Sequence, residues 1–163
     1  MRTHIPTYRI GLLMPFNDFS AQSQTAFFGK HVINDIHDML ETEDIKIKTR
    51  RVTPFRWNSN AGNHILERVN ASDSLIIDIS YNEPTMYYSF GIISLAAQIN
   101  LWDMNIFLIK NEDYCEHVNL PPFLEDYADE VIKYRFNENG LSIVSAYKYN
   151  EMLESIGEEM FEV

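Results

Sequence analysis

The stretch from Asp73 to Gln98 constrains the fold more than any other part of the sequence. It opens with a nearly continuous apolar run, Leu75 to Ile79, which is typical of a strand buried on both faces of a parallel sheet. Asp78 interrupts the run near its end, and Pro84 suits the first turn of a helix because its φ is fixed and it has no N–H. The stretch therefore predicts a buried strand, a polar loop and a helix, in that order.

The same alternation of strand and helix recurs along the chain. We expect strands at 8–14, 45–52, 75–79, 104–110 and 130–135, and helices at 26–41, 61–70, from 84 onward and at 140–161. Such a pattern predicts an α/β fold: a single doubly wound domain over residues 1–163, of the flavodoxin-like or Rossmann-like kind. We expect a five-stranded parallel sheet of order 2-1-3-4-5, with a core over about 8–135 and an amphipathic C-terminal helix. The apolar and basic alternation of 45–52 indicates an edge strand.

This strand order places a candidate site at one edge of the sheet. Its switch point falls between the first and third strands, and open α/β sheets bind ligands at the carboxyl ends of strands at such a point. We therefore expect Met14 to Asn17 and Asp78 to Ser89 to face one crevice.

Composition excludes several classes of partner. The net charge is −11, with 24 acids against 13 Lys and Arg, so most of the surface would repel a nucleic-acid backbone and we expect no nucleic-acid polymer as partner. We interpret the basic residues of 46–51 as solvated strand residues, while a small anionic ligand stays compatible with the chain. The single cysteine, Cys115, fits a reducing cytoplasm, and no segment approaches the roughly twenty apolar residues that a membrane helix needs. No metal site or cofactor is predicted.

The central stretch resembles a known family. Its order of strand, Asp, polar loop, Pro and Tyr-Tyr-x-x-Gly is similar to the core motif of the nucleoside 2-deoxyribosyltransferase-like and TIR-like nucleotide-binding superfamily, with weaker matches at Met14 to Phe16 and Pro122 to Leu124. In that family the segment reads Asn-Pro-Asn-Val-Tyr-Tyr-Glu-Leu-Gly, and its Glu attacks or stabilises the sugar carbon of an N-glycosidic bond. Ser89 occupies the position of that Glu here.

The resemblance implies a set of site residues and a class of ligand. The ligand would be a nucleoside, a nucleotide or an NAD-like small molecule, in a pocket that family members often complete across a homo-oligomer interface. The implied catalytic positions are Asp78, Glu83 and Ser89, and the implied ligand-binding positions are Met14, Pro15, Phe16, Asn82, Tyr87, Tyr88 and Gly91. Glu83 stands six residues before Ser89, where some deoxyribosyltransferases carry a second acid.

Three functions stay open at this point. An N-glycosidic bond transferase or hydrolase would use Glu83 or Asp78 in place of the family Glu. A nucleotide-recognising domain would keep the pocket with reduced or absent catalysis, which is the reading we favour because a serine carries no charge to stabilise the transition state. In an acidic protein-interaction module, Tyr81 and Phe90 would fill the pocket, Asp78 would cap a backbone turn and Glu83 would be a solvated loop acid.

Overall fold

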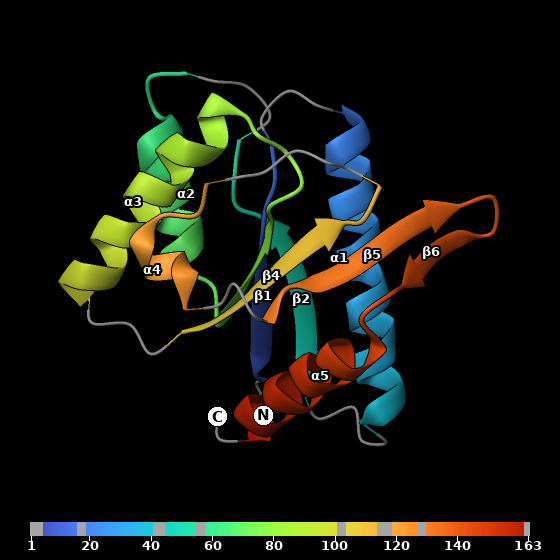
Figure 1. Cartoon of the computed structure of the whole chain (residues 1–163). Helices are drawn as coiled ribbons and strands as arrows, with labels where there is room; N and C mark the ends of the chain where they lie inside the picture. Colours follow the sequence, from blue (N-terminus) through green and yellow to red (C-terminus); the bar gives the residue numbers. More distant parts are fainter. Residues whose placement is uncertain are drawn as a thin grey trace.

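A six-stranded mixed sheet of order β2-β1-β3-β4-β5-β6 forms the centre of the computed structural model (Figure 1). The structure describes residues 5–15, 19–40, 45–54, 58–100, 104–113, 119–126 and 130–161. The strands are β1 (Thr7–Leu13), β2 (Lys46–Arg51), β3 (Ser74–Asp78), β4 (Asn105–Asn111), β5 (Ile132–Asn137) and β6 (Gly140–Ile143). The helices are α1 (Phe19–Met39), α2 (Ala61–Asn70), α3 (Pro84–Asn100), α4 (Pro122–Glu125) and α5 (Ala146–Phe161).

The predicted order 2-1-3-4-5 is confirmed for the first five strands, which are parallel, but the prediction of a purely parallel five-stranded sheet is wrong. A sixth strand, β6, pairs antiparallel with β5 through Phe136 and Leu141. Gly140 causes the reversal: its φ of 107° is accessible to glycine and strained for other residues, so the chain turns back at once. Residues 140–143 are therefore a strand, and the last helix begins at Ala146 rather than at 140.

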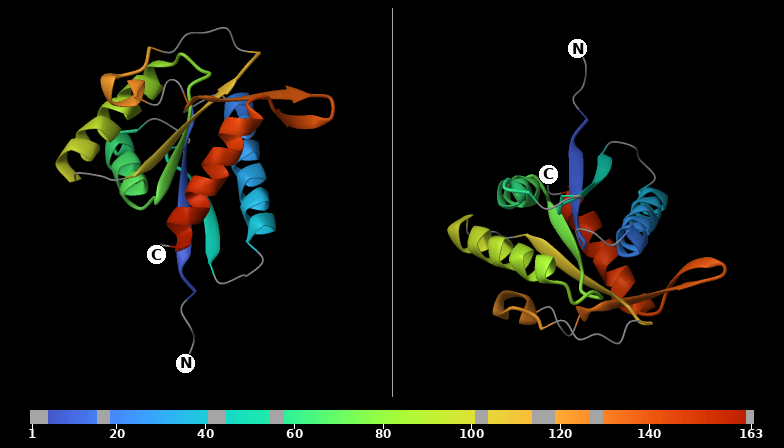
Figure 2. Two further views of the ribbon diagram at one scale, coloured as in Figure 1. Left: turned by 60° about the horizontal axis from the view of Figure 1, so that its bottom comes forward. Right: turned by 90° about the horizontal axis from the view of Figure 1, so that it is seen from above.

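Helices cover the sheet on both faces, as a doubly wound fold requires (Figure 2). On one face, α1 and α5 pack their apolar side chains, including Phe28, Ile36 and Ile156, against the sheet. On the other face, α2 and α3 pack Ile65 and Phe90 in the same way. The β5–β6 hairpin extends past the sheet beside α1, where the rings of Phe27 and Phe136 meet edge to face with centroids 6.2 Å apart.

The pairing of the central strands brings the two predicted site segments to the same edge. β1 lies between β2 and β3, and Leu13 is in register with Ile77, so the carboxyl ends of β1 and β3 are neighbours. β2 forms one edge of the sheet, which confirms the expectation from its alternating basic residues. In the described part of the chain, no helix is long and apolar enough to cross a bilayer.

Candidate active site at the carboxyl edge of the sheet

Asp78, the last residue of β3, is fully buried and accepts hydrogen bonds from three residues. Its Oδ2 accepts from the Thr25 hydroxyl of α1 at 2.8 Å and from the Tyr134 hydroxyl of β5 at 2.5 Å, and its Oδ1 accepts from the Ser80 N–H at 2.9 Å. The last of these bonds caps the turn that follows β3. Asp78 thus joins α1, β3 and β5 beneath the protein surface.

Two opposing effects act on the pKa of Asp78. Burial raises the pKa because it disfavours the charged carboxylate, and this effect outweighs the hydrogen bonds from Ser80, Tyr134 and Thr25, which lower it. The pKa of Tyr134 is also raised, first by burial and then by the neighbouring Asp78. The pair therefore favours a neutral phenol that donates to the carboxyl group.

A second set of polar side chains extends this network toward α1. The Gln24 Oε1 accepts from the Tyr81 hydroxyl at 2.8 Å and from the Asn111 Nδ2 at 3.1 Å. The Asn111 N–H in turn donates to the Ser80 hydroxyl at 2.6 Å. The sequence did not predict Gln24, Asn111 or the role of Tyr134. Asn111 could have been identified, because it is a polar residue at the carboxyl end of the buried strand β4.

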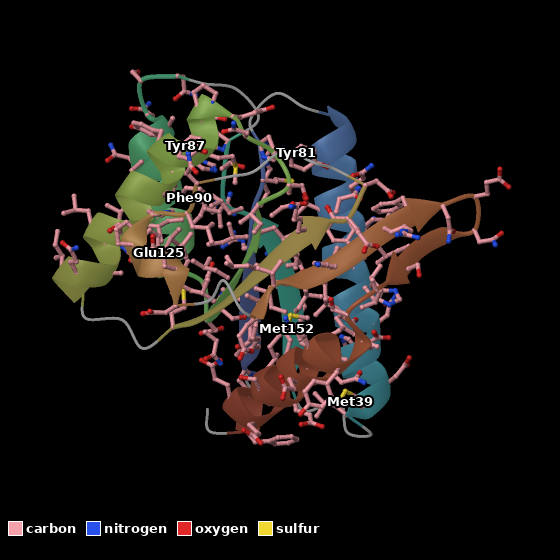
Figure 3. All side chains as sticks on the ribbon, in the orientation of Figure 1. Met39, Tyr81, Tyr87, Phe90, Glu125 and Met152 are labelled. Carbon is pink, nitrogen blue, oxygen red and sulfur yellow. The ribbon has the colours of Figure 1, made fainter. Side chains whose placement is uncertain are left out.

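The predicted ligand-binding residues on the first turns of α3 lie at the surface instead. Tyr87 and Tyr88 are 37% and 42% exposed. The Tyr87 hydroxyl donates to the Asn82 Oδ1 at 2.8 Å and accepts from the Asn119 N–H at 3.2 Å, so Asn119 lies against α3. Figure 3 shows Tyr87 on α3 and Tyr81 nearer to α1. Asn82, Tyr87 and Tyr88 are therefore accessible to a ligand.

Ser89, at the position of the family Glu, is fully buried, and its hydroxyl donates to the Thr85 carbonyl within the same helix at 2.8 Å. Glu83 is half-buried just before α3 and accepts from the Thr85 hydroxyl at 3.4 Å. Of the three predicted catalytic positions, Glu83 has the most accessible side chain.

Gly91 does not bring α3 close to a neighbouring element. It is exposed, and a Cβ built there would meet no described atom within 4 Å. The close approach occurs at Gly62 of α2 instead, where a Cβ would lie 2.8 Å from the Tyr88 hydroxyl.

The loop after β1 is held by backbone contacts. Met14 is buried in the α1 layer, and its carbonyl accepts from the Thr53 hydroxyl at 2.6 Å. The Pro15 carbonyl accepts from the Arg51 Nη2 at 3.0 Å, while Phe16, the third residue predicted in this loop, lies outside the described residues. The ends of β1 and β3 are thus adjacent. The side chains of Met14 and Asp78 are buried on the side of the sheet that α1 covers, whereas Tyr87 and Tyr88 lie on α3, which covers the other side.

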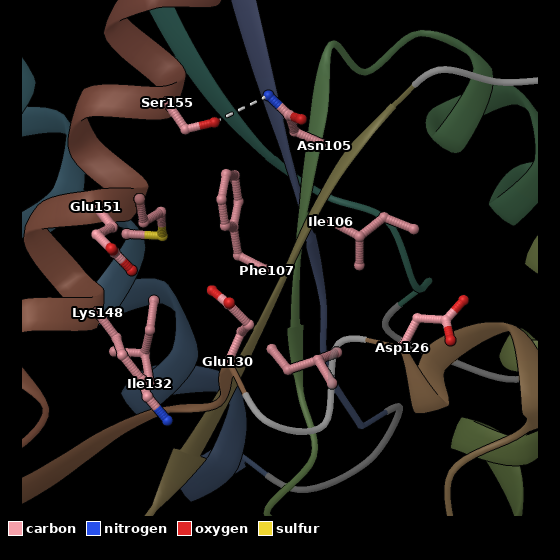
Figure 4. A pocket seen from close by; sticks show the side chains of 11 residues that line it. Asn105, Ile106, Phe107, Asp126, Glu130, Ile132, Lys148, Glu151 and Ser155 are labelled. Carbon is pink, nitrogen blue, oxygen red and sulfur yellow. Dashed lines mark hydrogen bonds between the residues drawn. The ribbon is translucent and has the colours of Figure 1, made fainter.

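A pocket of about 520 Å³ lies away from this edge, beside the amino-terminal half of β4 (Figure 4). It exists because β5 pairs only with the last three residues of β4, from Ile109, and leaves the earlier ones without a strand on that side. Asp126, Glu130 and Glu151 make its lining acidic. Nevertheless, no group of three or more potential ligands in the described chain could hold a metal ion.

Comparison with known proteins supports the fold and leaves the chemistry open. No protein-family model and no curated protein sequence matches the chain. Among solved structures, an oxidoreductase from Corynebacterium diphtheriae superimposes with a TM-score of 0.53 at 12% sequence identity, over 94% of each chain. At that identity the likeness shows a shared α/β fold and nothing about activity.

Proposed function

We propose that this chain recognises a nucleoside or nucleotide at the carboxyl edge of its sheet and does not cleave it. One contrast carries the proposal: Asn82, Tyr87 and Tyr88, which suit binding, are accessible, whereas two of the three predicted catalytic residues are buried and bonded to protein. Asn82, just before α3, and Tyr87, on its first turn, offer an amide, a hydroxyl and an aromatic face, which suit a ribose and a base.

The chemistry of N-glycosidic cleavage supports the absence of turnover. The oxocarbenium-like transition state needs a carboxylate beneath the anomeric carbon, and a missing carboxylate removes the main interaction that lowers the barrier. Asp78 is enclosed by Thr25, Ser80 and Tyr134, and Ser89 bonds to its own helix. Of the three predicted catalytic positions, Glu83 is the one through which an active transferase or glycohydrolase would work.

A ligand panel tests the proposal. We would measure the melting temperature with nucleosides, nucleotides and NAD at 1 mM, and in parallel follow release of the free base or nicotinamide by chromatography. A ligand at about 100 times its Kd stabilises the fold by about 2.7 kcal/mol, which is easily detected. We expect a shift without release; release that is lost in Glu83→Gln would establish the hydrolytic alternative instead.

A pair of variants ties binding to α3. The combined Asn82→Ala and Tyr87→Phe change should weaken the ligand at least about tenfold, because it removes two polar groups that are worth about 1 kcal/mol each. Tyr147→Phe, at a 77% exposed tyrosine on α5, is the matched control and should leave binding unchanged. If no compound shifts the melting temperature while a basic protein partner binds in a salt-dependent way, the domain is an interaction module.

A further inference from the structure

A pocket of about 440 Å³ lies between β2 and α2, apart from the residues of the Asp78 network. Residues 48–51 of β2 line it, together with His64 and Arg68 of α2. Four of the chain's 13 Lys and Arg residues line it, namely Lys48, Arg50, Arg51 and Arg68. The described residues that line the pocket include no Asp or Glu, although the whole chain has a net charge of −11. The pocket lining is therefore positively charged, whereas the chain as a whole is negatively charged.

The cations are available to an anion. Among the described residues, no carboxylate forms an ion pair with Lys48, Arg50 or Arg68. The Arg51 guanidinium donates to the carbonyls of Pro15 and Pro54 at 3.0 Å each, so it is fixed at the pocket wall and contributes its charge. A cluster of arginines with a lysine suits a phosphate, whose oxygens accept several N–H bonds at once.

His64 reports the positive potential of the pocket. Its pKa is lowered, first by burial and then by Arg68, with a smaller effect in the same direction from Arg51, while Glu67 on the same helix acts in the opposite direction. A dianion in the pocket would oppose the effect of Arg68 and Arg51 and raise the pKa of His64. The imidazole of His64 is therefore an internal probe of occupancy.

The backbone of β2 adds donors. The N–H groups of Lys46 and Val52 bond to β1, at Pro6 and Leu12. Because residues alternate along a parallel ladder, the N–H groups of Thr49 and Arg51, two residues that line the pocket, point to the outer edge of the sheet.

We propose that the pocket between β2 and α2 binds a small phosphomonoester through Lys48, Arg50 and Arg68. The bound group is a compact dianion on a small molecule, since the pocket volume of about 440 Å³ suits a ligand rather than an extended chain. This site lies beyond β1 from the end of β3 and does not depend on nucleoside recognition.

NMR titration with inorganic phosphate and glucose 6-phosphate, at constant ionic strength, tests the proposal. We expect the His64 ring signals to move, its pKa to rise on saturation, and the ring signals of His31 and His37, both on α1, to stay in place. A hexaglutamate peptide serves as the contrasting probe. The proposal is wrong if phosphate leaves the His64 signals unmoved at 50 mM, or if the peptide binds and phosphate does not.

Matched charge variants distinguish binding at a specific site from non-specific electrostatic attraction. The Arg50→Gln and Arg68→Gln double variant should weaken phosphate binding at least tenfold. Arg9→Gln with Lys30→Gln removes the same charge from exposed positions outside the pocket and should change affinity less than twofold. Equal losses in both would overturn the proposal. The His31 and His37 signals check that each variant is folded, and the single Arg68→Gln change gives the same comparison if the double variant unfolds.

Discussion

The Tyr134 hydroxyl donates to Asp78 Oδ2 at 2.5 Å, although β4 lies between their strands in the sheet. Both residues are fully buried, and Asp78 also accepts hydrogen bonds from Thr25 and Ser80. A buried carboxyl group without a donor costs more than an ordinary lost hydrogen bond, because its desolvation is no longer offset. This relationship gives the first two predictions.

Tyr134→Phe should destabilise the fold by about 1–3 kcal/mol, because it leaves Asp78 buried with one donor fewer. Tyr149→Phe is the matched control. Tyr149 also donates to an aspartate, but that residue, Asp35, is 33% exposed and can bond to water instead. We therefore expect a loss of no more than about 1 kcal/mol there. Urea denaturation of both variants measures the loss in free energy of unfolding. Equal losses would show that the bond to Asp78 contributes no more to stability than the bond to Asp35.

Asp78→Asn should gain stability relative to the wild type as the pH rises. Because burial raises the pKa of Asp78 in the folded chain, its stabilising contribution is fully present below its ordinary pKa of 3.8 and is lost as the pH rises through the folded pKa. Asparagine does not titrate. The free energy of unfolding of the variant should therefore rise relative to that of the wild type as the pH increases from 3.8 through the raised pKa of Asp78. Chemical denaturation from pH 3.5 upward measures it. A shift in the opposite direction would mean that the hydrogen bonds to the carboxylate outweigh its burial.

Arg51→Lys should destabilise the fold by about 1–2 kcal/mol, since a single ammonium cannot reproduce the planar guanidinium that bonds the carbonyls of Pro15, Thr53 and Pro54. Burial lowers the pKa of Arg51 to about 10, which shows how far this group is withdrawn from water. Arg9→Lys, at an exposed position of β1, should change stability by less than about 0.5 kcal/mol. Comparable losses at both positions would contradict the role of Arg51.

Gly140→Ala should destabilise the β5–β6 hairpin by about 1 kcal/mol or more, because alanine is strained at a φ of 107°. Gly157→Ala tests the opposite case. Gly157 lies inside α5, where a Cβ would meet no described atom within 4 Å, so the change should stabilise by about 0.5–1 kcal/mol. Thermal melts should show shifts of opposite sign, and a stabilising Gly140→Ala would rule out the strained turn.

The spacing of apolar residues predicted those helices and strands in which the apolar residues of the sequence are the ones buried in the structure. The helix at 61–70 and the edge position of β2 followed from apolar spacing and basic alternation, because each element has one face in the core. β6 was missed because Leu141, Val144 and Tyr147 recur at helical spacing, whereas Leu141 lies on a strand that the turn at Gly140 pairs with β5. The order of the parallel strands was expected from the doubly wound fold class rather than from any single residue.

The candidate site was less predictable, because its geometry depends on distant pairing. Asp78 stood out in the sequence as an acid in an apolar run, but its donors Thr25 and Tyr134 come from α1 and β5. The sequence places Tyr87 and Tyr88 on a helix. Which side of that helix is exposed depends on its contacts with α2 and with Asn119, which only the structure shows.

The Asp78 network also bears on how the chain matures during synthesis. Thr25 precedes Asp78 by 53 residues and Tyr134 follows it by 56, so a nascent polypeptide that has emerged only through β4 holds this aspartate without its phenol partner. Synthesis of β5 supplies that partner, so Tyr134 links the last parallel strand to the burial of Asp78.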